Sequence, residues 1–216
     1  MMAGMSTRRR DPAPTPEPDS EPEIGAGRDW RDTLRNGADL ALAGIVTFVV
    51  AAPIVTAGAA LATASAAIAE FCRTERFPST GDSARRFGRG ILPGLGASVV
   101  ALVLVWLFAL NLQLLREGTV PGGGALIAAT TIVGVLVLGV AGLTLVEIGR
   151  AGGKGWRSAA RAAVDVALRR PVVALAEGGV LSLAVLLAVL IPVCAPILLG
   201  YALFALHVVA RRFLPA

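Results

Sequence analysis

Three long stretches without a charged residue constrain the fold of this chain more than any other feature. They cover residues 91–115, 125–146 and 178–206, the last interrupted only by Pro192 and Pro196. Each exceeds the roughly 18 uncharged apolar residues that indicate a membrane-spanning helix, and about 20 such residues cross a hydrocarbon core about 30 Å thick. The third stretch is long enough for most of two crossings. The sequence therefore predicts an all-α fold, a polytopic helical membrane bundle.

The composition agrees with a membrane protein. Of the 216 residues, 55% are hydrophobic and 16% are charged, and the mean hydropathy is +0.72. A soluble domain is about 45–50% apolar and about 25% charged. The formal net charge of +5 would suggest nucleic-acid binding in a soluble protein, but here the basic residues lie between the apolar stretches. Membrane orientation explains them better, and we expect no nucleic-acid partner.

The positions of the basic residues predict the orientation of the helices. Basic residues concentrate in segments 73–90 and 150–170 and at the C-terminus, whereas segment 116–124 contains one and segment 192–196 contains none. Short loops rich in Lys and Arg stay in the cytoplasm. We therefore expect the first two segments and the C-terminus to be cytoplasmic and the other two segments to lie outside.

This orientation defines four transmembrane helices in two hairpins, in a multi-pass protein of the inner (plasma) membrane. The hairpins pair residues 91–115 with 125–149, and residues 172–191 with 193–210.

A further apolar segment, residues 40–71, contains Pro53. Proline removes a helical hydrogen bond and clashes with the preceding turn. One alternative is a single kinked span with the N-terminus outside. The other is a short or re-entrant hairpin broken at Pro53, with both ends inside.

The N-terminal region divides into two predicted parts. Residues 1–27 are acidic and rich in proline, which is typical of a disordered tail. Residues 28–213 form the helical membrane domain. At its start, residues 28–37 predict a short amphipathic helix at the membrane interface, with Trp30 and Leu34 on one face.

Ionisable residues inside spans are costly and are candidates for function. Glu147, Glu177 and His207 lie near the predicted cytoplasmic ends of their helices. They predict a shared polar cluster, a proton-linked or ligand-binding vestibule open to the cytoplasm. The alternative is that each group reaches the interface separately or pairs with a nearby arginine.

Residues 156–170 form a second predicted amphipathic helix. Arg157, Arg161, Asp165 and Arg169 repeat every four residues, and Arg161 and Asp165 are spaced to form an ion pair. The helix could lie on the cytoplasmic leaflet with its arginines near anionic headgroups. It could instead dock a soluble partner.

Signs of catalysis are absent from the sequence. There is no GxxxxGK[ST], HExxH or GxSxG motif, and the chain has one histidine. Cys72 and Cys194 lie on opposite predicted faces of the membrane and show no zinc or haem spacing. We therefore predict no catalytic residue, no cofactor and no metal site.

Four short features of the chain form a recognisable set. They are the stretch PIVTAGAALATA from Pro53 to Ala64, the segment ARRFGR at residues 84–89, a basic helix before the last hairpin, and PILLGYALFALH from Pro196 to His207. Together they resemble the YesL-like family of bacterial integral membrane proteins, a domain of unknown function. The resemblance covers about residues 30–213. It implies an accessory role in carbohydrate uptake and carries over no catalytic residue.

Two functional hypotheses follow. The first is a non-enzymatic accessory component of a transport system, which contacts transporter subunits through residues 156–170 or 84–89. The second is a small autonomous transporter or channel with a cytoplasm-facing polar vestibule. A transporter of polar solutes needs several polar groups near the membrane midplane, and Thr130, Thr131 and Ser182 are the best available. This scarcity favours the first hypothesis. Faces of small residues, such as Ala59, Ala62, Ala66 and Ala69, indicate close helix packing, either internal or in a homo-oligomer.

Overall fold

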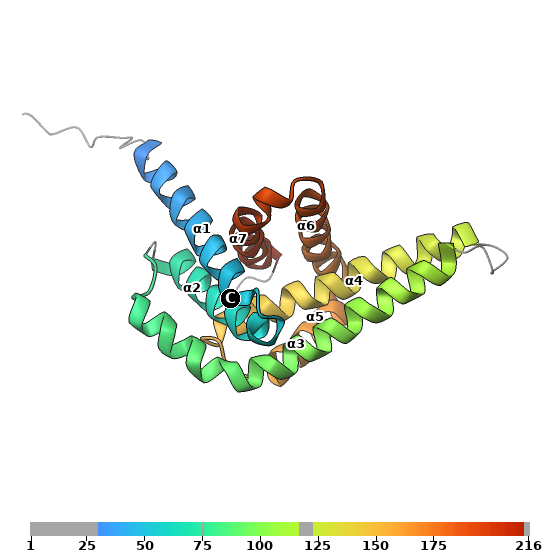
Figure 1. Ribbon diagram of the computed structural model, residues 1–216, viewed down its shortest axis with the longest axis horizontal. Coiled ribbons are helices and arrows are strands. Elements are labelled where there is room, and N and C mark those ends of the chain that lie inside the picture. Colours follow the sequence, from blue (N-terminus) through green and yellow to red (C-terminus); the bar gives the residue numbers. More distant parts are fainter. Residues whose placement is uncertain (1–29, 75, 117–122, 214–216) are drawn as a thin grey trace, which may run out of the picture. The chain divides into compact units, whose positions relative to one another are not determined.

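The structure, a computed structural model, describes residues 30–74, 76–116 and 123–213. In these ranges the chain is helical and contains no strand (Figure 1). The elements are α1 (Trp30–Ala51), η1 (Ile54–Thr56), α2 (Ala57–Thr74), α3 (Thr80–Arg116), α4 (Gly123–Arg150), α5 (Trp156–Arg169), α6 (Pro171–Leu190), η2 (Pro192–Cys194) and α7 (Ala195–Phe213).

The predicted all-α class is confirmed. Among the described residues, six helical stretches are long and apolar enough to cross a membrane by length and composition. They include both predicted hairpins and the two parts of the proline-broken first segment. The predicted tail at residues 1–27 lies outside the described residues.

The chain divides into two units, residues 1–36 and residues 37–216. Of the first unit, only residues 30–36 are described, as the first turns of α1. The predicted separate helix at residues 28–37 is therefore wrong for its described part, which continues into the apolar segment. No proline separates Trp30 from Leu40, and an existing helix adds each further turn more easily than it forms a new nucleus. All contacts described below lie within the second unit.

Pro53 divides the first apolar segment into two helices. Helix α1 ends at Ala51, and α2 begins at Ala57 after the single turn of η1. Thr56 closes this turn, because its backbone N–H donates to the Pro53 carbonyl at 2.7 Å and its hydroxyl donates to the Val50 carbonyl at 2.6 Å. Of the two alternatives, the structure has the two-helix form. Helix α1 has 22 residues and α2 has 18, and α1 starts ten residues before Leu40.

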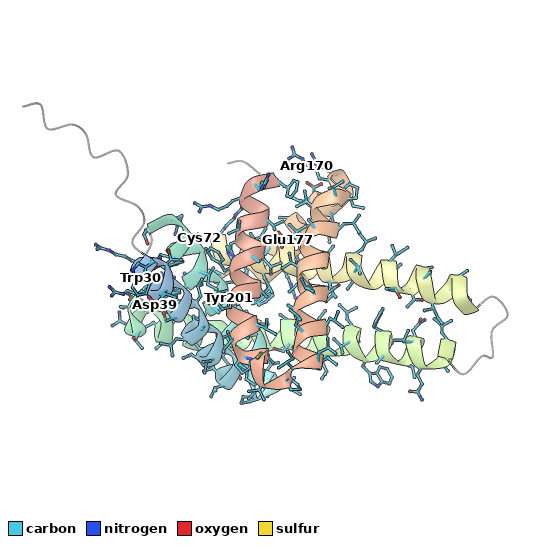
Figure 2. All side chains as sticks on the ribbon, turned by 90° about the horizontal axis from the view of Figure 1, so that it is seen from above. Trp30, Asp39, Cys72, Arg170, Glu177 and Tyr201 are labelled. Atoms are coloured by element: carbon cyan, nitrogen blue, oxygen red, sulfur yellow. The ribbon has the colours of Figure 1, made fainter. Side chains whose placement is uncertain are left out.

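Helices α4 and α6 approach each other at backbone distance. A Cβ atom at Gly139 would overlap the Ala174 carbonyl oxygen, and one at Gly178 would overlap the Val135 carbonyl oxygen. Figure 2 shows the α6–α7 hairpin crossing α4 steeply, and only residues without a bulky side chain allow such a crossing. Helices α4 and α6 therefore do not run parallel to each other.

Two more glycine pairs bring other helices together. Gly58 of α2 lies against Gly94 of α3, and the Ser98 hydroxyl accepts the Gly58 backbone N–H at 2.8 Å. Ser98 thus satisfies one of the amide groups that an α-helix leaves unpaired at its N-terminus. In the second pair, Gly44 of α1 lies against Gly200 of α7, where a Cβ on either would overlap the opposite backbone.

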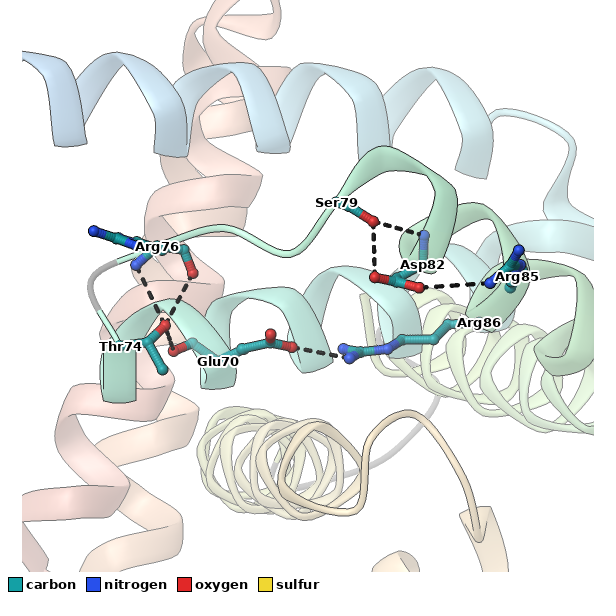
Figure 3. Close-up of polar contacts among 7 residues, drawn as sticks. All are labelled: Glu70, Thr74, Arg76, Ser79, Asp82, Arg85 and Arg86. Carbon is teal, nitrogen blue, oxygen red and sulfur yellow. Dashed lines mark hydrogen bonds and ion pairs between the residues drawn. The ribbon is translucent and has the colours of Figure 1, made fainter.

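Segment 73–90, predicted as a loop, is mostly helical. Helix α3 begins at Thr80 because Ser79 caps it: the Ser79 hydroxyl accepts the Asp82 backbone N–H at 3.2 Å and donates to the Asp82 carboxylate at 2.7 Å (Figure 3). Residues of this type at that spacing stabilise a helix start. Residues 84–89, expected as a contact loop, are accordingly part of α3.

The core lies among α2, α4, α6 and α7, where Ile68, Val146, Leu203 and Leu206 are buried. The packing role predicted for Ala59, Ala62, Ala66 and Ala69 is confirmed, since all four are buried. By contrast, the middle of α3 exposes large apolar side chains on every side. They include Val100, Val105 and Trp106. Such a surface suits the hydrocarbon core of a membrane.

The close approach of α4 and α6 at Gly178 leads to a prediction that two adjacent glycines can test. Gly178→Ala should destabilise the protein by about 1–3 kcal/mol, because the added methyl group has no room against the Val135 carbonyl. Gly179→Ala is the matched control, since nothing lies within 4 Å of its Cβ position, and it should stabilise the helix by up to about 1 kcal/mol. Unfolding in detergent, followed by circular dichroism, measures both. Equal behaviour of the two variants would contradict the close approach of α4 and α6.

Candidate polar site

One face of α4 lies against three buried polar side chains, those of Ser65, Glu177 and His207. Gly139, Gly142, Val146 and Gly149 follow the i, i+3, i+7, i+10 spacing of a single helix face, here called the glycine face. This face meets α6 at Gly139 and Gly142, and meets α2 and α7 at Gly149. Each glycine leaves space that a neighbouring helix fills with backbone or with a polar side chain.

Glu177 of α6 fills the space at Gly142. Its side chain is wholly buried at 0% exposure, and neither carboxylate oxygen has a hydrogen-bond partner in the described part of the chain (Figure 2). A Cβ at Gly142 would lie 3.3 Å from Oε2 and equally close to the apolar side chains of Leu181 and Leu206. The alternative interpretation of the sequence was that this carboxyl group reaches the interface or pairs with an arginine. In the structure it is buried and pairs with no arginine side chain.

His207 of α7 lies against Gly149, near the C-terminal end of the glycine face. Its ring is 3% exposed, Nδ1 lies 2.9 Å from the Leu203 carbonyl oxygen, and Nε2 lies 3.4 Å from the Ser65 hydroxyl. A carbonyl only accepts, so the proton of the neutral ring is assigned to Nδ1. The Ser65 hydroxyl donates to the Leu145 carbonyl and so ties α2 to α4 beside the ring.

Glu147, the third predicted residue, is partly exposed and forms an ion pair with Arg150 at 3.0 Å. Among the described residues, no hydrogen bond or ion pair joins Glu177 to Glu147 or to His207. Direct contacts in this part of the chain therefore do not link the three residues to one another.

Helix α5 presents the other predicted residues. It packs through Ala159 and Ala163, which are buried, while Arg157 and Arg161 are exposed and form no ion pair or hydrogen bond in the described part of the chain. Asp165 pairs with Arg169 at 2.9 Å, so the expected Arg161–Asp165 pair is wrong. The Arg169 side chain reaches Asp165 from the other side at the same i,i+4 spacing.

A shallow hollow lies along this outer side of α5. Arg161, Val164 and Leu168 line it, and the two apolar side chains are 45% and 79% exposed. Basic and apolar groups therefore share the open face of α5.

The sequence did not predict the arginine contacts that join the ends of different helices. Arg211 donates to the Cys72 carbonyl near the end of α2, and Arg170 donates to the Phe213 carbonyl at 2.9 Å at the end of α7. Arg86 of α3 pairs with Glu70 of α2 at 2.9 Å (Figure 3). Basic side chains stabilise the unpaired carbonyl groups at helix C-termini. The local signal was present in the sequence, but the acceptors belong to other helices.

Other polar chemistry is sparse in the described residues. No group of three or more His, Cys, Asp or Glu side chains could hold a metal ion there, and Cys72 and Cys194 are both free thiols.

Comparisons of the chain with protein-family models, curated proteins and solved structures found no match. The YesL-like resemblance therefore stays a prediction that rests on the short motifs given above.

The contact between Ser65 and His207 generates a prediction of stability. Ser65→Ala should destabilise the protein by about 1–3 kcal/mol, because it removes this donor from the part-buried Leu145 carbonyl and removes the polar neighbour of Nε2. Ser158→Ala is the control: its hydroxyl makes one exposed bond to the Gly155 carbonyl at 2.8 Å, and the loss should stay within about 0.5 kcal/mol. Thermal unfolding in detergent measures the difference, and the absence of any difference would contradict a structural role for Ser65.

Proposed function

We propose that this chain is a non-enzymatic, multi-pass protein of the plasma membrane that serves as an accessory component of a transport system. In this proposal the partner is a transporter subunit, and the contact is made by the open face of α5. The YesL-like resemblance supports a carbohydrate transporter as the partner class. The observation that carries the proposal is that Arg157 and Arg161 are exposed without a partner beside exposed apolar side chains.

Such a mixed face suits a protein interface. Arginine is enriched among residues that dominate binding energy, and apolar side chains next to it exclude water. Leu168 is 79% exposed on a helix whose opposite side is already packed, so it contributes nothing to the fold as it stands. A partner with acidic and apolar groups would complement this face.

The polar residues that could line a transport path are engaged elsewhere, and this favours the accessory role over the autonomous transporter. Thr131 is exposed and its hydroxyl donates to the Ile127 carbonyl of its own helix at 2.8 Å. Thr130 donates to Asn111 of α3 at 3.3 Å, in an exposed contact. Both hydroxyl groups are therefore engaged in exposed contacts of α3 and α4, which offers no support for a polar path through the core.

The copurification of partners tests the proposal directly. We expect transporter subunits to copurify with the tagged chain after brief crosslinking in its native membrane, and we expect Arg157→Glu or Arg161→Glu to reduce their recovery at least tenfold. Reversing an exposed interfacial charge repels an acidic partner. Quantitative mass spectrometry of the eluates measures the recovery.

Arg212→Glu provides the matched control, because Arg212 is exposed at the end of α7 and makes the same change of charge away from α5. Equal recovery from all three variants would contradict docking through α5. Recovery of lipids alone would instead support the alternative that this face lies on anionic headgroups.

The proposed orientation can be tested with single cysteines. In a Cys72→Ser background, Cys194 in η2 should react with a membrane-impermeant maleimide added to intact cells, because the α6–α7 turn is proposed to lie outside. A second protein that lacks both native cysteines and carries Lys154→Cys, before α5, should react only after the cells are opened. Labelling of Lys154→Cys in intact cells would reverse the proposed orientation.

A further inference from the structure

The carboxyl group of Glu177 is isolated from every group that could neutralise it by contact. It is wholly buried, and neither oxygen accepts a hydrogen bond in the described part of the chain. Around the Cβ position of Gly142, the Glu177 Oε2 atom lies together with side-chain methyl groups of Leu181 and Leu206, all within 3.3 Å of that position. An ionised carboxylate in such apolar surroundings is strongly disfavoured unless a ligand neutralises it.

The chemistry of the surroundings selects the ligand. Calcium, magnesium and similar cations need several oxygen ligands around one point. The three nearest atoms around the Gly142 Cβ position are hydrocarbon apart from the Glu177 oxygen, and no cluster of three or more acidic, histidine or cysteine side chains exists among the described residues. A proton requires a single oxygen and no further ligand, so a proton fits this place and a metal ion does not.

The charged groups on the elements packed against α6 do not supply a contact either. On α4, Arg150 is bound to Glu147 at 3.0 Å. On α7, His207 is engaged with the Leu203 carbonyl, Arg211 is bound to the Cys72 carbonyl, and Arg212 is exposed. On α5, Asp165 and Arg169 pair with each other, and Arg157 and Arg161 are exposed. Helix α6 itself has no other ionisable residue.

We propose that Glu177 is a proton-binding site, whose carboxyl group carries the proton while α4 and α6 are packed together. The group lies six residues after the first residue of α6, about 9 Å along the helix axis. Because it is wholly buried, the proton exchanges with water only when the packing at Gly142 opens. The site thus makes the packing of α4 on α6 sensitive to proton uptake, independently of any partner at α5.

Infrared spectroscopy of the full chain in lipid nanodiscs tests this directly. At neutral pH the wild-type protein should show the carbonyl absorption of a protonated carboxyl group. The band should be absent from Glu177→Gln, which preserves shape without the titrating proton, and retained in Glu147→Gln, the matched control at an exposed ion pair. An unchanged spectrum in Glu177→Gln, or the loss of an ionised carboxylate band instead, would overturn the proposal.

Isotope labelling keeps the test decisive if Glu177→Gln fails to fold. Wild-type protein that contains glutamate labelled with ¹³C at the side-chain carboxyl should show the same band shifted to lower frequency at neutral pH. Exposed glutamates are ionised at that pH and contribute nothing to it. No shifted band would overturn the proposal, and neither measurement depends on whether a transport partner exists.

Discussion

The close approach of α4 to its neighbours is the contact on which the rest of the structure depends. Gly139 admits the α6 backbone, Gly142 admits the Glu177 side chain, and Gly149 admits Ser65 and His207. In a membrane, helix association gains little from the hydrophobic effect, because lipid is as apolar as the helices, so close packing and hydrogen bonds hold the helices together. The glycine face allows close packing because it brings backbones together, and it allows hydrogen bonds because it leaves room for polar groups.

The same face explains why the core contains polar side chains at all. Glu177 and His207 occupy the spaces above Gly142 and Gly149, where leucine at either position would leave no room for them. Beyond them, the side chains of Arg170, which precedes α6, and Arg211 of α7 bind the carbonyl groups of Phe213 and Cys72, at or near the ends of α7 and α2. Packing, buried polarity and the arrangement of helix ends therefore have a common origin.

Much of the fold could be predicted from local sequence. Uncharged length predicts the spanning helices, and proline at position 53 predicts the break between α1 and α2. The start of α3 was missed, because the basic residues of segment 73–90 were taken as a loop, although Ser79 and Asp82 carry a capping signal. Of the candidate site, the sequence identified Glu177 and His207 as costly ionisable residues, but Ser65, Gly142 and Gly149 carry no local sign of their role.

The sequence by itself determined the secondary structure, the apolar character and the separate position of each ionisable residue, because these follow from spacing and composition along one helix. Only the tertiary structure decided which of those residues are isolated. Glu147 and Glu177 are both glutamates near an end of an apolar helix, yet one pairs with Arg150 and the other has no partner in the described chain. That difference depends on which helix crosses at which residue, and crossings arise from contacts between residues far apart in the chain.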